Sequence, residues 1–292
     1  MSKTKKAVII GSVLVGIGVI IGFIGIAIGG FKFPNGAVDL TTMKALHTEK
    51  KTVQIADAFD KIEIAGASSM DIEICKSKTG KNYVEYYDTD DWTSHVDVKD
   101  HVLKFTTDDK GKHKAVVSLG FGKDTAARLY LADAEYKEIA VTTLSGYVTI
   151  QDVNAETVNV SASSGDLYMK NINATDSIMA TSSSGDIDLE NATAKQIELG
   201  ANSGDIEMQD ITAESLRMST SSGDIDLESC DAEKFDITTS SGDVDMEITA
   251  GRTYRFETKT NSGAVDVPDG DADSGYLCKI VTSSGDVEVK QK

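Results

Sequence analysis

The sequence is poor in the residues that carry most metal and enzyme chemistry. Its four histidines show no common ligand spacing, so a zinc site is not expected; they are His47, His95, His101 and His113. It has no phosphate-binding glycine loop, no GxSxG elbow and no HExxH pair. We therefore expect no catalytic residue, no metal ligand and no bound cofactor, and a protein that is not an enzyme.

Proline and cysteine are also scarce. Only two prolines occur in 292 residues, and no low-complexity linker divides the chain. The three cysteines, Cys75, Cys230 and Cys278, are an odd and widely separated set. Cys230 and Cys278 fall at positions that the pattern below turns inward, which favours buried free thiols over a disulfide. An outward-facing protein without disulfides suits a bacterium of the Gram-positive type.

Positive charge is lacking in the second half of the chain. The formal net charge is −18, and residues 146–292 carry all of it, with 28 acidic and 10 basic residues. A nucleic-acid-binding surface must be basic, so we exclude nucleic acid as a partner.

One long uncharged run stands out near the start. Residues 7–31 contain no charge and exceed the ~20 residues that cross a bilayer. Lysines precede the run at Lys3, Lys5 and Lys6, which predicts a cytoplasmic tail at 1–6 and an extracytoplasmic remainder. We interpret 7–31 as a single-pass transmembrane signal anchor in the cell membrane and 32–51 as a tether. A cleaved signal peptide is the alternative.

A short phrase containing Ser-Gly returns throughout the rest of the chain. Its glycines are spaced by 19 to 22 residues, which is the signature of a stacked repeat. They are Gly146, Gly165, Gly185, Gly204, Gly223, Gly242, Gly263 and Gly285. Glycine at a recurring corner indicates either a positive φ or a close approach to neighbouring backbone.

Each repeat contains two short segments in which apolar and polar residues alternate. In the unit Gly185–Ser203 these are 186–190 and 196–199, with small residues between them. Alternation of period two predicts strands with one buried face. Because the apolar positions coincide in every unit, we expect an all-β, parallel β-solenoid at 146–292, in which each coil lies directly over the preceding one.

Residues 52–145 are read as an irregular N-terminal β region that caps the solenoid. The strands expected there are 61–64, 70–74, 83–87, 95–98, 102–106, 115–119, 128–131 and 138–142. Tyr83, Tyr86, Tyr87 and Trp92 cluster in this region. Their alternation favours core aromatics of the cap over a platform for stacking on sugars.

The Ser-Gly-Asp phrase could suggest hydrolytic chemistry. It occurs six times, whereas a nucleophile is normally unique, so a structural role is favoured. Stacked aspartates ~4.8 Å apart repel by about 0.9 kcal/mol per pair in bulk water, so serine hydroxyls, counter-ions or Ca²⁺ should offset them. The Gly-Gly-x-Gly-x-Asp nonapeptide of calcium-loaded β-rolls is absent, which favours a screened surface ladder.

The opening Phe59-Asp60-Lys61-Ile62-Glu63-Ile64 and the tandem Ser-Gly-Asp units behind a membrane segment resemble the bacterial putative-adhesin family of β-strand-repeat domains of unknown function, which includes LiaG-like envelope proteins. The resemblance covers about residues 55–292 and implies an extracytoplasmic β-solenoid without established catalytic residues. It departs at 131–133, where Leu-Ala-Asp stands in place of a frequent proline.

The function expected is therefore that of a membrane-anchored, non-enzymatic adhesin or a structural, stress-associated envelope protein, with a cell-wall polymer or surface protein as partner. Two alternatives stay open. A carbohydrate-active β-helix enzyme would use Arg252 and Arg255 near the loop 269–275. A self-assembling scaffold would join rods end to end, although Lys290 and Lys292 would protect the strand 287–289 as an exposed edge.

Overall fold

The computed structural model describes residues 32–33, 36–37, 49–65, 70–88, 92–109, 126–249 and 251–292. The chain divides into two compact units. In the first, the strands β1 (Lys32–Phe33) and β2 (Gly36–Ala37) pair antiparallel. The expected membrane anchor at 7–31 lies outside the described residues, and within them no helix is long and apolar enough to cross a membrane.

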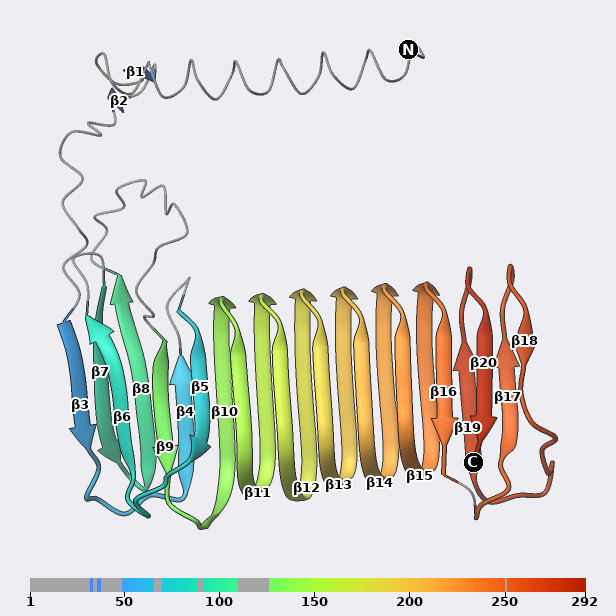
Figure 1. The fold of residues 1–292 in the computed structure, drawn as a ribbon, viewed down its shortest axis with the longest axis horizontal. Helices are drawn as coiled ribbons and strands as arrows, with labels where there is room; N and C mark the ends of the chain where they lie inside the picture. Colours follow the sequence, from blue (N-terminus) through green and yellow to red (C-terminus); the bar gives the residue numbers. More distant parts are fainter. Residues whose placement is uncertain are drawn as a thin grey trace, which may run out of the picture. The chain divides into compact units, whose positions relative to one another are not determined.

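The second unit is an all-β solenoid, as the repeat predicts (Figure 1). Its regular part consists of long strands that bend around the coil, so that each supplies segments to two sides. They are β10 (Glu135–Ser145), β11 (Val148–Ser164), β12 (Leu167–Ser184), β13 (Ile187–Ser203), β14 (Ile206–Ser222) and β15 (Ile225–Ser241), followed by β16 (Val244–Ile248). Consecutive members of this set pair parallel, with one local register shift each in the β11–β12, β12–β13 and β15–β16 pairs, which confirms the parallel β-solenoid.

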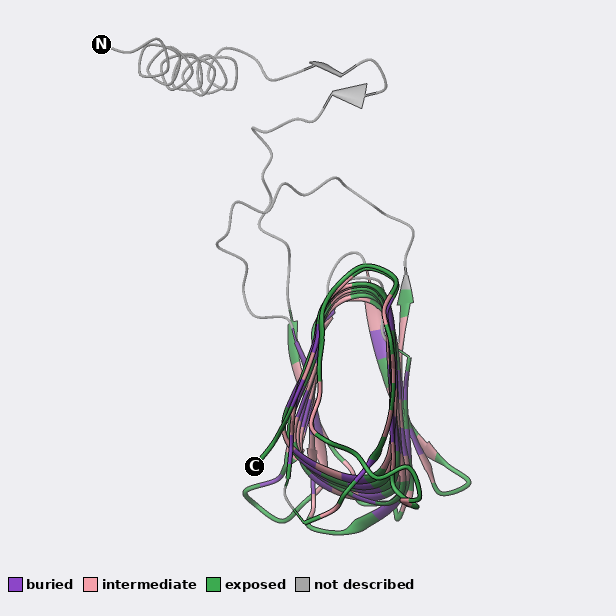
Figure 2. Cartoon of the chain, turned by 90° about the vertical axis from the view of Figure 1, so that its right-hand side faces the viewer, coloured by how far each residue is buried: buried purple, intermediate pink, exposed green. Residues whose placement is uncertain are grey.

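The core is a set of aliphatic columns inside the coil. Looking along the stack, the coils superpose as a closed oval whose strands alternate between buried and more exposed residues (Figure 2). One column runs Leu167, Ile187, Ile206, Ile225 and Val244, each directly opposite the next and each at most 1% exposed. The columns inferred from sequence therefore form the interior.

The corner glycines are required by close approach between coils. A Cβ on Gly204 would lie 2.2 Å from the carbonyl oxygen of Gly185, and a Cβ on Gly223 would lie 2.1 Å from that of Gly204. Real Cβ atoms do not approach backbone oxygens so closely, so only glycine lets the coils stack at this spacing.

The opposite corner uses a different device, which the sequence pattern did not reveal. One residue per coil has a left-handed backbone, with φ between 51° and 57°. These residues are Asp152, Asn171, Asn191, Asp210 and Ser229. Asn and Asp tolerate this region better than other non-glycine residues. The Asn171 side-chain amide also donates to Asp152 at 2.6 Å, and that of Asn191 donates to Asn171 at 2.7 Å.

Asn191→Val is expected to lower the free energy of unfolding by about 1–2 kcal/mol, because a β-branched residue is strained at φ 51° and the amide ladder is interrupted. Asn191→Gly should keep the backbone relaxed and lose only the ladder bond. Urea denaturation of both variants checks this, and equal losses would contradict a role for the backbone conformation.

The order of the coils at the C-terminal end corrects the expectation that each copy lies over the preceding one. The last coil, β19 (Leu277–Val281) and β20 (Val287–Gln291), pairs with β15 and β16 on one side. On its other side it pairs with β17 (Arg255–Lys259) and β18 (Val265–Asp266). The segment 287–289 is therefore an interior rung, and the interpretation of it as an exposed, charge-protected edge is wrong.

The N-terminal end shows the same inversion. The first coil, β4 (Lys61–Ala65) and β5 (Ile72–Lys76), lies between β10 and β11 on one side and a later coil on the other. That later coil is β8 (Val102–Asp109) and β9 (Ala127–Leu131). Three further strands pair antiparallel at this end: β3 (Glu49–Gln54) with β6 (Tyr83–Asp88), β6 with β9, and β7 (Trp92–Lys99) with β8. The first strand of this unit thus begins at Glu49 rather than Thr52, and the strand expected at 115–119 lies outside the described residues.

Candidate functional site

The aspartates of Ser-Gly-Asp hold neighbouring coils together. In each case one carboxylate oxygen accepts the backbone N–H of the aspartate in the next coil. The Oδ1 atoms of Asp186, Asp205 and Asp224 accept from Asp205, Asp224 and Asp243 at 2.9, 2.8 and 2.8 Å. A hydrogen bond to an ionised acceptor is stronger than a neutral one, so this ladder opposes the repulsion between stacked carboxylates. Backbone donors were not among the partners anticipated from sequence.

The outermost coil explains the one Ser-Gly-Ala. The backbone N–H of Ala264 donates to Asp286 Oδ1 at 2.7 Å, and the coil of Ala264 pairs only with the last coil among the described strands. Among the described strands, no coil therefore lies beyond residue 264 with a backbone N–H for which a side-chain acceptor at that position would be needed. The missing carboxylate alone does not identify the outermost coil, because Tyr147 occupies the same position in an interior coil, where its N–H donates to Asp71 Oδ1 at 2.9 Å.

The hydroxyl that bonds each corner belongs to the residue three positions before the corner glycine of its coil, and it donates to the glycine carbonyl of the preceding coil. Ser182 Oγ donates to the Gly165 carbonyl at 3.1 Å, and Thr220 and Thr239 donate to Gly204 and Gly223 at 3.1 and 3.3 Å. All three donors are at most 5% exposed. In the six Ser-Gly-Asp copies the serine directly before the glycine, such as Ser184, is exposed. A repeated structural corner, rather than a serine nucleophile, is what this geometry supports.

The most prominent surface feature is an acidic column on the outer face that follows the corner. Successive coils place carboxylates directly opposite one another: Asp188, Glu207, Asp226, Asp245 and Glu288. A hollow of about 470 Å³ runs along this face. Ion pairs bound it at both ends, Lys170 with Glu190 at 2.5 Å and Lys290 with Glu288 at 2.7 Å.

The three aspartates of this column, Asp188, Asp226 and Asp245, resist ionisation. Partial desolvation raises the pKa of Asp188, Asp226 and Asp245, and the neighbouring carboxylates Glu207, Asp245 and Glu288 respectively raise each further. By contrast, the hydrogen bonds from Lys170 and Tyr168 lower the pKa of Glu190. Where a basic partner is absent, the column is therefore electrostatically unfavourable at neutral pH.

We expect the solenoid to become more stable as the pH falls from neutrality through the raised pKa values of Asp188, Asp226 and Asp245. A carboxyl whose pKa is raised by folding binds protons more readily in the folded chain, so stability rises as the pH drops through the raised values towards the ordinary value of about 3.9. Asp226→Asn should stabilise at pH 7 on the order of 1 kcal/mol, or about 2–4 °C, and flatten the pH dependence. Melts at constant ionic strength check this, with exposed Asp176→Asn as the control; identical pH slopes in all three proteins would contradict it.

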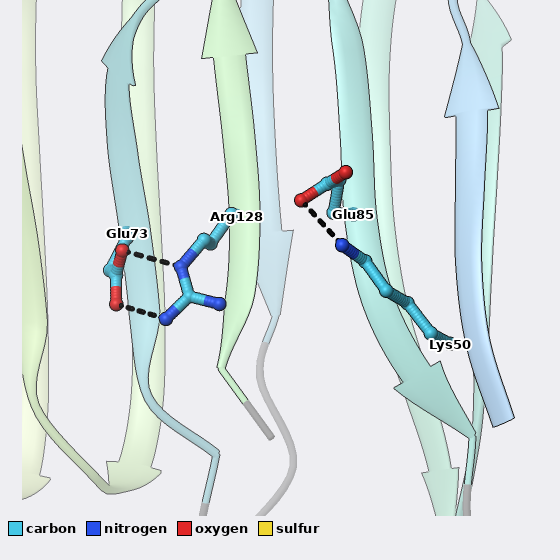
Figure 3. A network of polar contacts seen from close by, with 4 residues as sticks. All are labelled: Lys50, Glu73, Glu85 and Arg128. Atoms are coloured by element: carbon cyan, nitrogen blue, oxygen red, sulfur yellow. Dashed lines mark hydrogen bonds and ion pairs between the residues drawn. The ribbon is translucent and has the colours of Figure 1, made fainter. Parts of the chain in front are cut away.

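The same outer face is neutralised at the N-terminal end (Figure 3). Arg128 on β9 forms two hydrogen bonds to Glu73 on β5, at 2.8 and 3.0 Å. Lys50 on β3 pairs with Glu85 on β6 at 3.1 Å. Glu73 and Glu85 thus have basic partners, and this face changes from paired charges at the N-terminal end to stacked carboxylates in the repeats.

The aromatic cluster expected at 83–92 does not form one patch. Tyr86 is 5% exposed and packs edge-on against Phe105, with ring centroids 5.7 Å apart. Tyr83 lies on the outer face and stacks on Tyr130 at 4.4 Å. Trp92 packs against the core, and its indole N–H donates to the Tyr87 carbonyl at 3.4 Å. A sugar-stacking platform of all four residues is not built.

The cysteines and the two candidate arginines do not form a reactive site: the cysteines Cys230 and Cys278 are buried, and Arg252 and Arg255 form ion pairs. Cys230 and Cys278 are free and buried, as expected, and burial raises the pKa of each thiol to about 12. Arg252 pairs with Asp231 and lies 5.2 Å from the Tyr276 ring centroid, while Arg255 pairs with Glu257 at 3.2 Å. Across the described part of the chain, no three His, Cys, Asp or Glu side chains converge as metal ligands.

In-register coils, glycine corners and aspartate ladders define a parallel β-solenoid built from a repeated corner motif. Within that class, the chain belongs to the Toastrack DUF4097 family, whose model matches residues 59–292. This confirms the resemblance to a putative-adhesin family of unknown function. Among curated proteins, none matches the sequence.

Two solved structures are similar in fold. A putative adhesin from Bacteroides fragilis NCTC 9343 aligns with TM-score 0.51 and 18% identity over 84% of this chain and 97% of that one. A putative lipid binding protein from Parabacteroides distasonis ATCC 8503 aligns with TM-score 0.50 and 18% identity over 83% and 96%. At this identity the likeness establishes the fold alone.

Proposed function

We propose that this chain is a single-pass protein of the bacterial cell membrane whose solenoid projects outside the cell and acts without catalysis, as an adhesin or a structural, stress-associated envelope component. The uncharged run 7–31 after three lysines supports the anchor and its orientation. The tether 32–51 leads into β3, which pairs at the N-terminal end of the stack. The outermost coil at the other end of the stack, β17 and β18, forms the tip of the solenoid.

The main support for this proposal is that the polar groups at the repeated Ser-Gly-Asp corner form hydrogen bonds between neighbouring coils. The aspartate carboxylates bind backbone N–H groups, and the buried hydroxyls bind glycine carbonyls. What remains for function is an extended face whose side chains repeat at every coil. Such a face suits a long or repeating partner, so a cell-wall polymer or a surface protein fits better than a small substrate. Its acidity disfavours nucleic acid.

Two observations bear on the alternatives. A carbohydrate-active enzyme would need Arg252 and Arg255 free to meet substrate, whereas both form ion pairs with carboxylates. An end-to-end scaffold would need an open strand edge at the tip. There β18 has only two residues and Pro268 follows closely, which blunts that edge.

The topology is tested with the full chain in intact bacteria. Externally added protease should degrade the solenoid, whereas a variant lacking 7–31 should remain inside and be protected. Binding is tested by comparing cells with and without the protein for retention of purified wall polysaccharide. Protection of the full chain in intact cells would overturn the proposed orientation, and shortening of the polysaccharide during the assay would favour the enzyme.

A further inference from the structure

The out-of-sequence insertion of the last coil has a physical cause on the outer surface. One column there contains Glu198, Arg217, Asp236, Lys279 and Glu257, each directly opposite the next. In this spatial order the charges alternate strictly. Arg217 reaches Asp236 at 3.9 Å, and Lys279 reaches Asp236 at 3.4 Å.

Stacking in sequence order would break the alternation. With β17 directly on β15, Glu257 would face Asp236 instead of Lys279. In the neighbouring column, Arg255 would face Lys234, whereas Leu277 now separates them. Like charges directly opposite one another on paired strands are destabilising, so both columns disfavour that order.

The volumes of the buried side chains also favour the observed order of the coils over the sequential order. Cys278 lies between Phe235 and Phe256 in the buried column. The small thiol leaves room for Tyr254, whose ring packs against Phe235 at 5.7 Å and whose hydroxyl donates to the Ala232 carbonyl at 2.7 Å. Sequence order would set Phe235 directly against Phe256 and crowd this site.

We propose that the charge column Glu198–Arg217–Asp236–Lys279–Glu257 and the Phe235–Cys278–Phe256 column make the last coil a latch. The last coil, β19–β20, inserts between β15–β16 and β17–β18 and closes the tip. The competing state is a misordered stack in which the coils follow the order of the sequence and β17 lies directly on β15. Among the described strands β17 and β18 pair only with β19 and β20, so the outermost coil is held in the ladder through the latch. The tip can close only when residues 277–291 are in place.

The N-terminal end follows the same rule. There Lys61 on β4 faces Glu138 on β10 and pairs with it at 3.0 Å. That contact exists only because β4 is inserted next to β10. On its other side, Glu63 pairs with Lys104 of β8 at 2.7 Å. The first and the last coil of the solenoid, which contain β4 and β19, are thus both held as interior rungs by opposite charges.

The test is the double variant Glu257→Lys/Lys279→Glu, made in the full chain. It keeps composition and net charge, but it makes the sequential order the alternating one. The coil order is read by oxidising two cysteine pairs. Thr238→Cys/Val281→Cys joins strands that are adjacent in the observed order, whereas Thr238→Cys/Lys259→Cys joins strands adjacent only in the sequential order. A separation of one rung, ~4.8 Å, fits a disulfide, and two rungs do not.

We expect the 238–281 pair to oxidise readily in the parent chain and the 238–259 pair not to. In the swapped background the ratio of the two rates should fall roughly tenfold, because the contact between positions 236 and 279 becomes a like-charge pair in the observed order, whereas the sequential order gains an opposite-charge pair between positions 236 and 257. Cys230 and Cys278 should not take part in the oxidation, since burial raises the pKa of both thiols to about 12.

The matched control swaps the exposed pair Asp176 and Lys195, 3.7 Å apart on neighbouring coils, as Asp176→Lys/Lys195→Asp. This swap preserves opposite charges and should leave the ratio unchanged. Hydrogen exchange gives a second readout: in the Glu257→Lys/Lys279→Glu chain, β17 and β19 should lose protection while β12 and β13 keep it. An unchanged oxidation ratio together with unchanged protection of β17 and β19 would overturn the proposal.

Discussion

Gly204→Ala is expected to destabilise the solenoid by about 3 kcal/mol or more. The added Cβ would lie 2.2 Å from the Gly185 carbonyl oxygen and 2.6 Å from its carbon. Both are backbone atoms in the interior of a rigid stack, so no flexible side chain can move aside. The coils must separate locally, which weakens the ladder bonds on each side, and overpacking of this kind typically costs 1–3 kcal/mol or more.

Gly200→Ala is the matched control, because it makes the same chemical change in the same coil. At Gly200 the nearest atoms to an added Cβ are side-chain atoms of Ser219 and Thr181, both 3.7 Å away, which is ordinary contact. This variant should be neutral or more stable by about 0.4–1 kcal/mol, since alanine restricts the unfolded chain. Urea denaturation of both proteins checks the pair, and similar midpoints would show that close approach does not explain the repeated glycine.

The repeated part of the fold could be predicted from sequence because its determinants are local and periodic. Alternation within each unit gives the strands, and the constant position of Leu189, Met208 and Leu227 within the unit gives the shared interior. The left-handed corner at Asn171 and Asn191 was less visible, because Asp and Ser occupy the same position elsewhere and dilute the pattern.

The order of the terminal coils could not be predicted from periodicity. Both β17 and β19 alternate inward and outward residues and therefore both read as coils of the repeat, although β17 has Thr258 at the inward position where β19 has Ile280. The information lies in single residues outside the repeat pattern: Lys279 between two carboxylates and Cys278 between two phenylalanines. These pairings can be recognised only once it is known which strands lie on either side of β19 in the stack.

The chemistry of the repeated corner was also only partly predictable. Six copies of Ser-Gly-Asp argue from sequence against a unique nucleophile. The partner of the carboxylate was not foreseeable, because the accepting oxygen and the donating N–H, as in Asp186 and Asp205, lie a full coil apart. Stacked carboxylates were expected to form a surface ladder, and the raised pKa values of Asp188, Asp226 and Asp245 follow from partial burial and from the carboxylates of neighbouring coils.

Phe235→Ala is expected to lower the free energy of unfolding by about 3–5 kcal/mol, the usual range for removing a fully buried phenylalanine. Phe235 is 0% exposed, lies opposite Leu216 and Cys278, and packs edge-on against Tyr254. Because Cys278 is small, it cannot fill the cavity. Tyr254 would lose its main packing partner, and the tip should loosen before the rest of the stack.

Phe256→Ala is the control, because it removes the same side chain from the same column one rung beyond Cys278. Phe256 is only half-buried in the outermost coil, so its loss should cost about 1–2 kcal/mol. Since a solenoid is stabilised mainly by contacts between neighbouring coils, Phe235→Ala should also split the urea transition into an early step at the tip and a later step for β11–β14. Hydrogen exchange assigns the steps, and a single cooperative transition with equal losses in the two variants would contradict the view that Phe235 joins the tip to the repeats.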